Sequence, residues 1–117
     1  MKKIYFYSLI LFLFCINLNA QTIDVVTGLS GNPNRLLLHG NDLYFTEQIS
    51  NKLSKIDLSS NDPVAVNVID LTESSGSMAL NGNDLYIAIY GANKISKIDI
   101  SSNAPVLIDV ITGLNQP

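Results

Sequence analysis

The stretch GNDLYFTEQISNKLSKIDLSSN, residues 40–61, recurs later in the chain as GNDLYIAIYGANKISKIDISSN, residues 82–103. Aligned without a gap, residues 38–64 and 80–106 are identical at 17 of 27 positions. An internal repeat of this length is typical of solenoids, propellers and other arrays of similar units. The sequence therefore predicts two copies of one supersecondary unit.

Each copy carries the signals of four short strands. A Gly-Asn-Asp turn precedes an aromatic and β-branched run, LYFT at 43–46 and LYIA at 85–88, which favours a strand. A polar break follows, then KLSKIDL or KISKIDI, and then a turn whose proline can only begin or edge a strand. With the short apolar segment before each Gly-Asn-Asp turn, every repeat is expected to form four antiparallel strands. No helical period is present after residue 20.

The same residues carry a resemblance to known repeats. The order Asn-Pro, apolar triplet, Gly-Asn-Asp-Leu-Tyr, Asn-Lys and Ser-Lys-Ile-Asp is similar to the repeats of NHL-type and YWTD-type β-propellers, over residues 21–117. The resemblance implies propeller blades of four antiparallel strands. The second copy departs from it, because Ala88-Ile89 replaces Thr46-Glu47. Propellers of these families include binding modules, scaffolds and enzymes, so the resemblance implies an architecture rather than an activity.

The predicted fold is all-β, with two propeller-type blades of four antiparallel strands and one extra N-terminal strand. Blade one is expected at 33–71, blade two at 76–114, and the extra outer strand at 22–29, because IDVVTGL from Ile23 matches IDVITGL from Ile108 at six of seven positions. Two blades do not make a ring of at least four, and their open faces would expose apolar side chains. Three arrangements stay open: part of a longer propeller, a homo-oligomer completing a ring, or an open two-blade sandwich.

Residues 1–20 are expected to be a helical signal peptide. Lys2 and Lys3 precede an apolar run at 4–18, and Ala20 supplies the small residue before a cleavage site. This run is shorter than the roughly 20 residues of a spanning helix, so no stable membrane span is expected after cleavage. The chain is therefore predicted to be exported, to the periplasm or the extracellular medium. Cys15 lies in this leader, so the exported part has no thiol.

The charge of the exported part argues against two classes of partner. Removing Lys2 and Lys3 changes the formal net charge from −3 to −5. Nucleic acids and anionic membrane surfaces attract clustered lysine and arginine, which this part lacks. Its basic residues are scattered: Arg35, Lys52, Lys55, Lys94 and Lys97.

The catalytic and metal signals are weak. His39 is the single histidine, which excludes a two-histidine zinc motif within one chain, and no GxSxG motif is present. Three acidic residues, Asp42, Asp84 and Glu47, are candidate Ca²⁺ ligands, since equivalent positions of a closed ring can converge on an axial channel. The resemblance adds that gluconolactonase-like six-bladed propellers hold an axial divalent metal.

A structural interpretation competes with the metal site. Several polar residues that recur in both copies of the repeat are explained as turn residues. Asp57 and Asp99 are expected to pair with Lys55 and Lys97 across the strands. The expected turn residues are Asn41, Asp42, Asn51, Asn83, Asp84 and Asn93. The residues expected to pack between blades are Leu43, Tyr44, Ile56, Leu85, Tyr86 and Ile98.

The sequence thus favours a non-catalytic, secreted binding or scaffold module for a protein or glycan, without a resident cofactor. The alternative is a fragment of a metal-dependent six-bladed propeller enzyme, a gluconolactonase-like hydrolase or lyase. Activity that depends on Ca²⁺ would favour the enzyme, and a metal-independent ligand would favour the scaffold.

Overall fold

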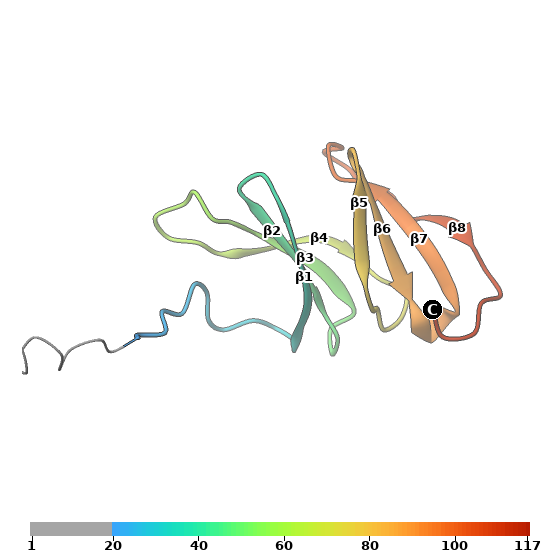
Figure 1. Ribbon diagram of the computed structural model, residues 1–117, viewed down its shortest axis with the longest axis horizontal. Helices are drawn as coiled ribbons and strands as arrows, with labels where there is room; N and C mark the ends of the chain where they lie inside the picture. The colour runs from blue at the N-terminus through green and yellow to red at the C-terminus, as the bar shows by residue number, and fades with distance from the viewer. Residues whose placement is uncertain (1–19) are drawn as a thin grey trace, which may run out of the picture.

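The computed structural model describes residues 20–117, so the expected signal peptide lies, except for Ala20, outside the described residues (Figure 1). The described chain is all-β apart from one short 3-10 turn, and it forms two antiparallel four-stranded sheets. The predicted all-β class, with two antiparallel four-stranded units, is confirmed. The first sheet contains β1 (Pro33–His39), β2 (Asp42–Glu47), β3 (Lys52–Asp57) and β4 (Ala65–Asp70) in that spatial order. The second contains β5 (Met78–Asn81), β6 (Asp84–Ile89), β7 (Lys94–Asp99) and β8 (Ile108–Ile111), with η1 (Tyr90–Ala92) before β7.

The hairpins of the two sheets use the same backbone conformations. Gly40 and Gly82, between the first two strands of each sheet, have φ values of 59° and 61°. Asn51 and Asn93 precede the third strands with φ values of 50° and 52°, in the left-handed region that asparagine tolerates better than most residues. The repeated sequence therefore reproduces its turns as well as its strands.

The two sheets pack face to face around a shared apolar core. We call the face of each sheet that carries Leu43 or its equivalent Leu85 the leading face, and the opposite one, with Tyr44 or Tyr86, the trailing face. Tyr44 and Leu53 on the trailing face of the first sheet pack in one cluster with the leading-face residues of the second. The core cluster comprises Tyr44, Leu53, Leu71, Leu85, Ile87, Ile89 and Ile98.

Equivalent residues differ in burial because only one leading and one trailing face are covered by a sheet. Tyr44 is 3% exposed, whereas Tyr86 at the same position of the second sheet is half-buried. Leu36 on the leading face of the first sheet is 68% exposed, whereas its equivalent Met78 is half-buried against the core. The leading face of the first sheet and the trailing face of the second are therefore left without a covering sheet.

The extra strand expected at 22–29 does not form. Residues 20–32 contain no strand, and Figure 1 shows this segment passing below the first sheet without joining it. The physical reason is that β3 already pairs with β4 and β7 with β8, so neither third strand has an open edge. The segment faces the leading face of the first sheet, where Ile23, Val25 and Val26 line a cavity of about 270 Å³ with Leu43 and Phe45.

The residues expected to pack between blades divide into three groups. Tyr44, Leu85 and Ile98 lie in the core between the two sheets. Leu43 and Ile56 lie on the leading face of the first sheet, opposite residues 23–29. Tyr86 lies on the open trailing face of the second sheet. Only the first group therefore packs between sheets within this chain.

Candidate functional site

The carboxylates singled out in the Gly-Asn-Asp turns form ion pairs within their own sheets. Asp42 Oδ2 lies 2.7 Å from Lys55 Nζ, and Asp84 Oδ2 lies 2.7 Å from Lys97 Nζ. The hydrogen bond to the Asp42 carboxylate is the main cause that raises the pKa of Lys55. These part-exposed pairs add little to stability, because solvent screens them.

The expected pairing of Asp57 with Lys55 and of Asp99 with Lys97 is therefore wrong. The register places Asp42 opposite Asp57, so the two carboxylates repel and Lys55 bonds to Asp42 on the diagonal. Asp57 turns toward the following loop, where the backbone N–H of Ser59 donates to its Oδ1 at 2.8 Å. Asp99 accepts from Ser101 in the same way at 2.9 Å.

Glu47 lies in a cage of hydroxyl groups at the end of β2. Its side chain is buried, and it accepts hydrogen bonds from Ser54 Oγ at 2.6 Å and Ser30 Oγ at 2.7 Å. Ser50 Oγ lies at 3.4 Å, and the backbone N–H of Gly31 also donates to the carboxylate. Burial alone would raise the pKa of Glu47, but these hydrogen bonds outweigh it and hold the pKa below its ordinary value. Through these hydrogen bonds, Glu47 joins the segment before β1 to the β2–β3 hairpin.

In the second sheet, the equivalent serine hydroxyl donates to a different carboxylate. Ile89 stands in place of Glu47, and Ser96, the equivalent of Ser54, donates to Asp109 Oδ1 at 2.8 Å. Lys94 Nζ also lies 2.9 Å from this carboxylate. Hydrogen bonds from Lys94 and Ser96 lower the pKa of Asp109.

The candidate Ca²⁺ ligands are not brought together. Asp42 and Asp84 belong to ion pairs in different sheets, and Glu47 is occupied by serine hydroxyls. Across residues 20–117, no three His, Cys, Asp or Glu side chains gather closely enough to hold a metal ion. His39 is exposed at the end of β1.

Sequence reasoning missed a cavity where the two sheets meet, whose lining is about equally polar and apolar. We call it the junction pocket. It has a volume of about 300 Å³ and lies between the start of β1, the β2–β3 turn and the connection into β5. Its lining residues are Asn34, Arg35, Gln48, Ser75, Gly76, Ser77, Tyr90, Gln116 and Pro117. The available sequence signal was Arg35, the single arginine of the chain.

Arg35 has an unusual backbone conformation. Its φ is 41°, a region that costs a residue with a side chain roughly 1–2 kcal/mol. The pairing of β1 with β2 shifts register between Asn34 and Leu36, so Arg35 is the extra residue of a bulge. Asn34 Oδ1 accepts the Arg35 backbone N–H at 3.0 Å and helps to hold this shape. Bulges of this kind redirect a side chain, and non-glycine residues in strained conformations cluster at functional sites.

The junction pocket offers hydrogen-bonding groups and positive charge. Arg35 is exposed and takes part in no ion pair within residues 20–117. Ser75 is buried, and among the described residues its hydroxyl has no hydrogen-bond partner. Asn34 and Gln48 add amide side chains, and Tyr90 adds a partly exposed ring. Arg35, the two amide side chains and the exposed hydroxyl of Ser77 can bind a planar carboxylate and several hydroxyls together.

Comparison with known proteins adds no assignment: no protein-family model matches the chain, and no curated protein matches it. Of the helical structure in residues 20–117, none has the length and apolar character needed to span a membrane.

Proposed function

We propose that this chain is a secreted, non-catalytic binding module in which the two sheets are successive blades of a β-propeller and the junction pocket binds an acidic glycan. The blade interpretation is supported by the repeated strand order and by the packing of one trailing face on one leading face. In this arrangement the first strands of neighbouring blades lie close together, as β1 and β5 do. The pocket thus lies at the inner end of a blade junction.

The observation that carries the binding proposal is Arg35 in its bulge. A strained backbone is retained where the surrounding structure enforces it, and here it places the one arginine of the chain in a concave site that has several polar side chains. A guanidinium group binds a carboxylate through two parallel hydrogen bonds. The ligand is therefore expected to carry a carboxylate at the position that Arg35 reaches.

The remaining lining favours a glycan over a protein partner. A cavity of about 300 Å³ is at the lower end of the range of small-molecule sites, whereas protein partners bind over broader, flatter surfaces. Two amide side chains and a serine hydroxyl suit sugar hydroxyls, and Tyr90 can stack on a sugar ring. A uronic acid carries the carboxylate, the hydroxyls and the sugar ring in one residue.

The test is isothermal titration of the protein with a uronic-acid oligosaccharide, beside a neutral oligosaccharide of equal length. We expect binding of the acidic ligand only, and a loss of about tenfold or more in R35A, since a charge-assisted hydrogen bond is worth about 1.5–3 kcal/mol. R35K should lose most of this affinity, because lysine lacks the planar fork.

K52A is the matched control, since it removes a positive charge outside the junction pocket. Equal binding by wild type and R35A, or equal weakening by K52A, would contradict the proposal. Binding of an acidic peptide in preference to both oligosaccharides would assign the pocket to a protein partner instead.

A further inference from the structure

Residues 23–29 correspond closely to residues 108–114 in sequence and share a left-handed glycine at the same position. The two segments differ only in Val26 and Ile111. Their glycines, Gly28 and Gly113, have φ values of 71° and 73°. One segment begins with β8 and pairs with β7, whereas the other contains no strand. The same sequence is thus found once with and once without a strand partner.

The unpaired segment has open hydrogen-bonding groups. No backbone–backbone hydrogen bond joins residues 22–30 to any part of the described chain. In the paired counterparts, Leu114 N–H donates to Asn93 O at 2.9 Å and Leu71 N–H donates to Asn51 O at 2.7 Å. Leu29, at the equivalent position, makes no such bond. An extended segment with free amides and carbonyls can add to the edge of another sheet.

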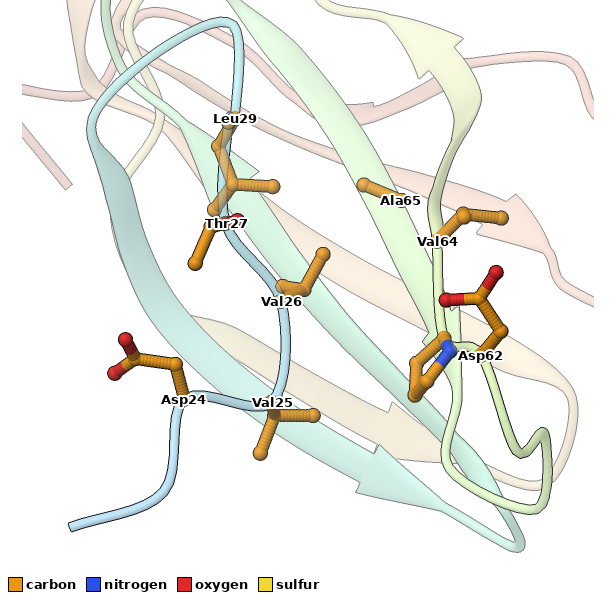
Figure 2. Close-up of a pocket in the computed structure, with 10 residues that line it drawn as sticks. Asp24, Val25, Val26, Thr27, Leu29, Asp62, Val64 and Ala65 are labelled. Carbon is orange, nitrogen blue, oxygen red and sulfur yellow. The ribbon is translucent and has the colours of Figure 1, made fainter.

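The side chains of the segment match the edge that its counterpart occupies. Asp109 accepts from Ser96 and pairs with Lys94 on β7. Asp24 is the equivalent of Asp109, and within residues 20–117 it forms no ion pair. Figure 2 shows its carboxylate pointing away from residues 62–65, across a cavity of about 330 Å³. Asp24 can therefore meet the same serine and lysine on β7 of another molecule.

The uncovered apolar faces of the two sheets indicate that the other molecule is a second copy of this chain. The connection from residues 23–29 into β1 corresponds to the connection from β4 into β5, which places a trailing face on a leading face. When residues 23–29 leave the leading face of the first sheet and bind β7 of a second copy, that face, with the exposed Leu36 and Leu38, can pack on the open trailing face of that copy, with Tyr86 and Ile95. This contact repeats the interface inside the chain and buries apolar surface that is now exposed.

We propose that residues 23–29 of one copy replace β8 on β7 of a second copy, so that two segments of nearly the same sequence compete for one sheet edge. The exchange itself conserves strand pairing, and the new contact between sheets drives association. Its basis, the unpaired segment, is separate from the junction pocket, so the proposal does not depend on glycan binding.

The first test weakens the binding of β8 to β7. D109A removes the acceptor that holds β8 to Ser96 and Lys94, so residues 23–29 of another copy should replace it more easily. Light scattering after size-exclusion chromatography, over a wide range of protein concentration, should show a dimer or a larger ring in D109A at about a tenfold lower concentration than in wild type. D24A and the double variant D24A/D109A should stay monomeric. A monomeric D109A, or association that D24A leaves unchanged, would overturn the proposal.

A second test applies even where D109A folds poorly. Ile111 pairs with Ile95, so Val26 of one copy should lie opposite Ile95 of the other. V26C protein mixed with I95C protein should form an intermolecular disulfide under mild oxidation. T72C, at an exposed residue outside the segment, is the control and should not cross-link to I95C. Equal cross-linking of V26C and T72C to I95C, or none of V26C, would exclude the exchange.

Discussion

Ser54 and Ser96 occupy the same position in the two repeats, yet Ser54 donates to Glu47 Oε1 at 2.6 Å and Ser96 donates to Asp109 Oδ1 at 2.8 Å. The acceptor has moved from the second strand of the first sheet to the fourth strand of the second. Where the repeat loses Glu47 to Ile89, it replaces Asn67 by Asp109. A buried hydroxyl therefore keeps a charged acceptor in both sheets.

This exchange predicts a compensating substitution in the first sheet. E47I removes the acceptor of Ser54, Ser30 and the Gly31 N–H, and it should lower the free energy of unfolding by about 1–3 kcal/mol because buried polar groups lose their partner. E47I/N67D should recover part of this loss, since residue 67 lies opposite Ser54. Urea unfolding followed by circular dichroism measures both. N67D alone is the control, and a double variant no more stable than E47I would contradict the explanation.

The cage around Glu47 also predicts an acid-sensitive stability. The pKa of Glu47 is lowered in the folded chain from its ordinary value of 4.5, so its carboxylate stabilises the fold above that pH. The stabilisation is lost as the pH falls through the folded pKa. Asp57, Asp99 and Asp109 also have lowered pKa values, so the comparison must isolate Glu47. The unfolding free energy of wild type should therefore fall below pH 4.5 more steeply than that of E47Q; parallel curves would argue against the cage.

The uncovered face predicts unequal effects of the same substitution in the two repeats. Y44A should cost about 3–5 kcal/mol or prevent folding, because Tyr44 is buried between the sheets. Y86A should cost less than half as much in dilute protein, because no sheet covers its ring. Thermal unfolding of the two variants at equal concentration compares them. Equal destabilisation would mean that the trailing face of the second sheet is covered in solution.

The positive φ values of Asn51 and Asn93 predict which substitutions these two turns accept. N51A should destabilise by about 1 kcal/mol, because alanine disfavours a φ of 50° and glycine does not. N51G should be near neutral, whereas N93G should lose some stability, because Asn93 Oδ1 accepts the Gln116 backbone N–H at 3.0 Å. Midpoints of urea unfolding give the comparison. A greater loss in N51G than in N51A would show that the Asn51 side chain, rather than the backbone, matters at this turn.

Much of this fold could be predicted from the repeat. Aromatic, β-branched and apolar runs between turn signals located all eight strands, because a strand hairpin depends on local turn chemistry and on burial of apolar side chains. The N-terminal strand was predicted wrongly for a physical reason. Residues 23–29 have the sequence of a strand, but a strand also needs an open edge, and sequence similarity does not show whether one is free.

The junction pocket could not be predicted in the same way. It is formed by a bulge at Arg35, a linker with Ser75 and a turn with Tyr90, which are distant in sequence and lie in the least repeated parts of the chain. The ion pairs were also missed, because the choice of Lys55 between Asp42 and Asp57 depends on strand register. Patterns within one strand therefore predicted the strands, but which of their residues are buried, and the contacts across strands, required coordinates.

The most direct test of the proposed function is to map the ligand on the protein. Backbone amide signals of the isotope-labelled chain should be followed by NMR during titration with a uronic-acid oligosaccharide. We predict that the largest shifts fall on Arg35, Gln48, Ser75, Ser77 and Tyr90, and that R35A abolishes them together. Shifts concentrated on the uncovered faces or the Asp42 and Asp84 turns, or no shifts at ligand excess, would contradict the assignment of the junction pocket as a glycan site.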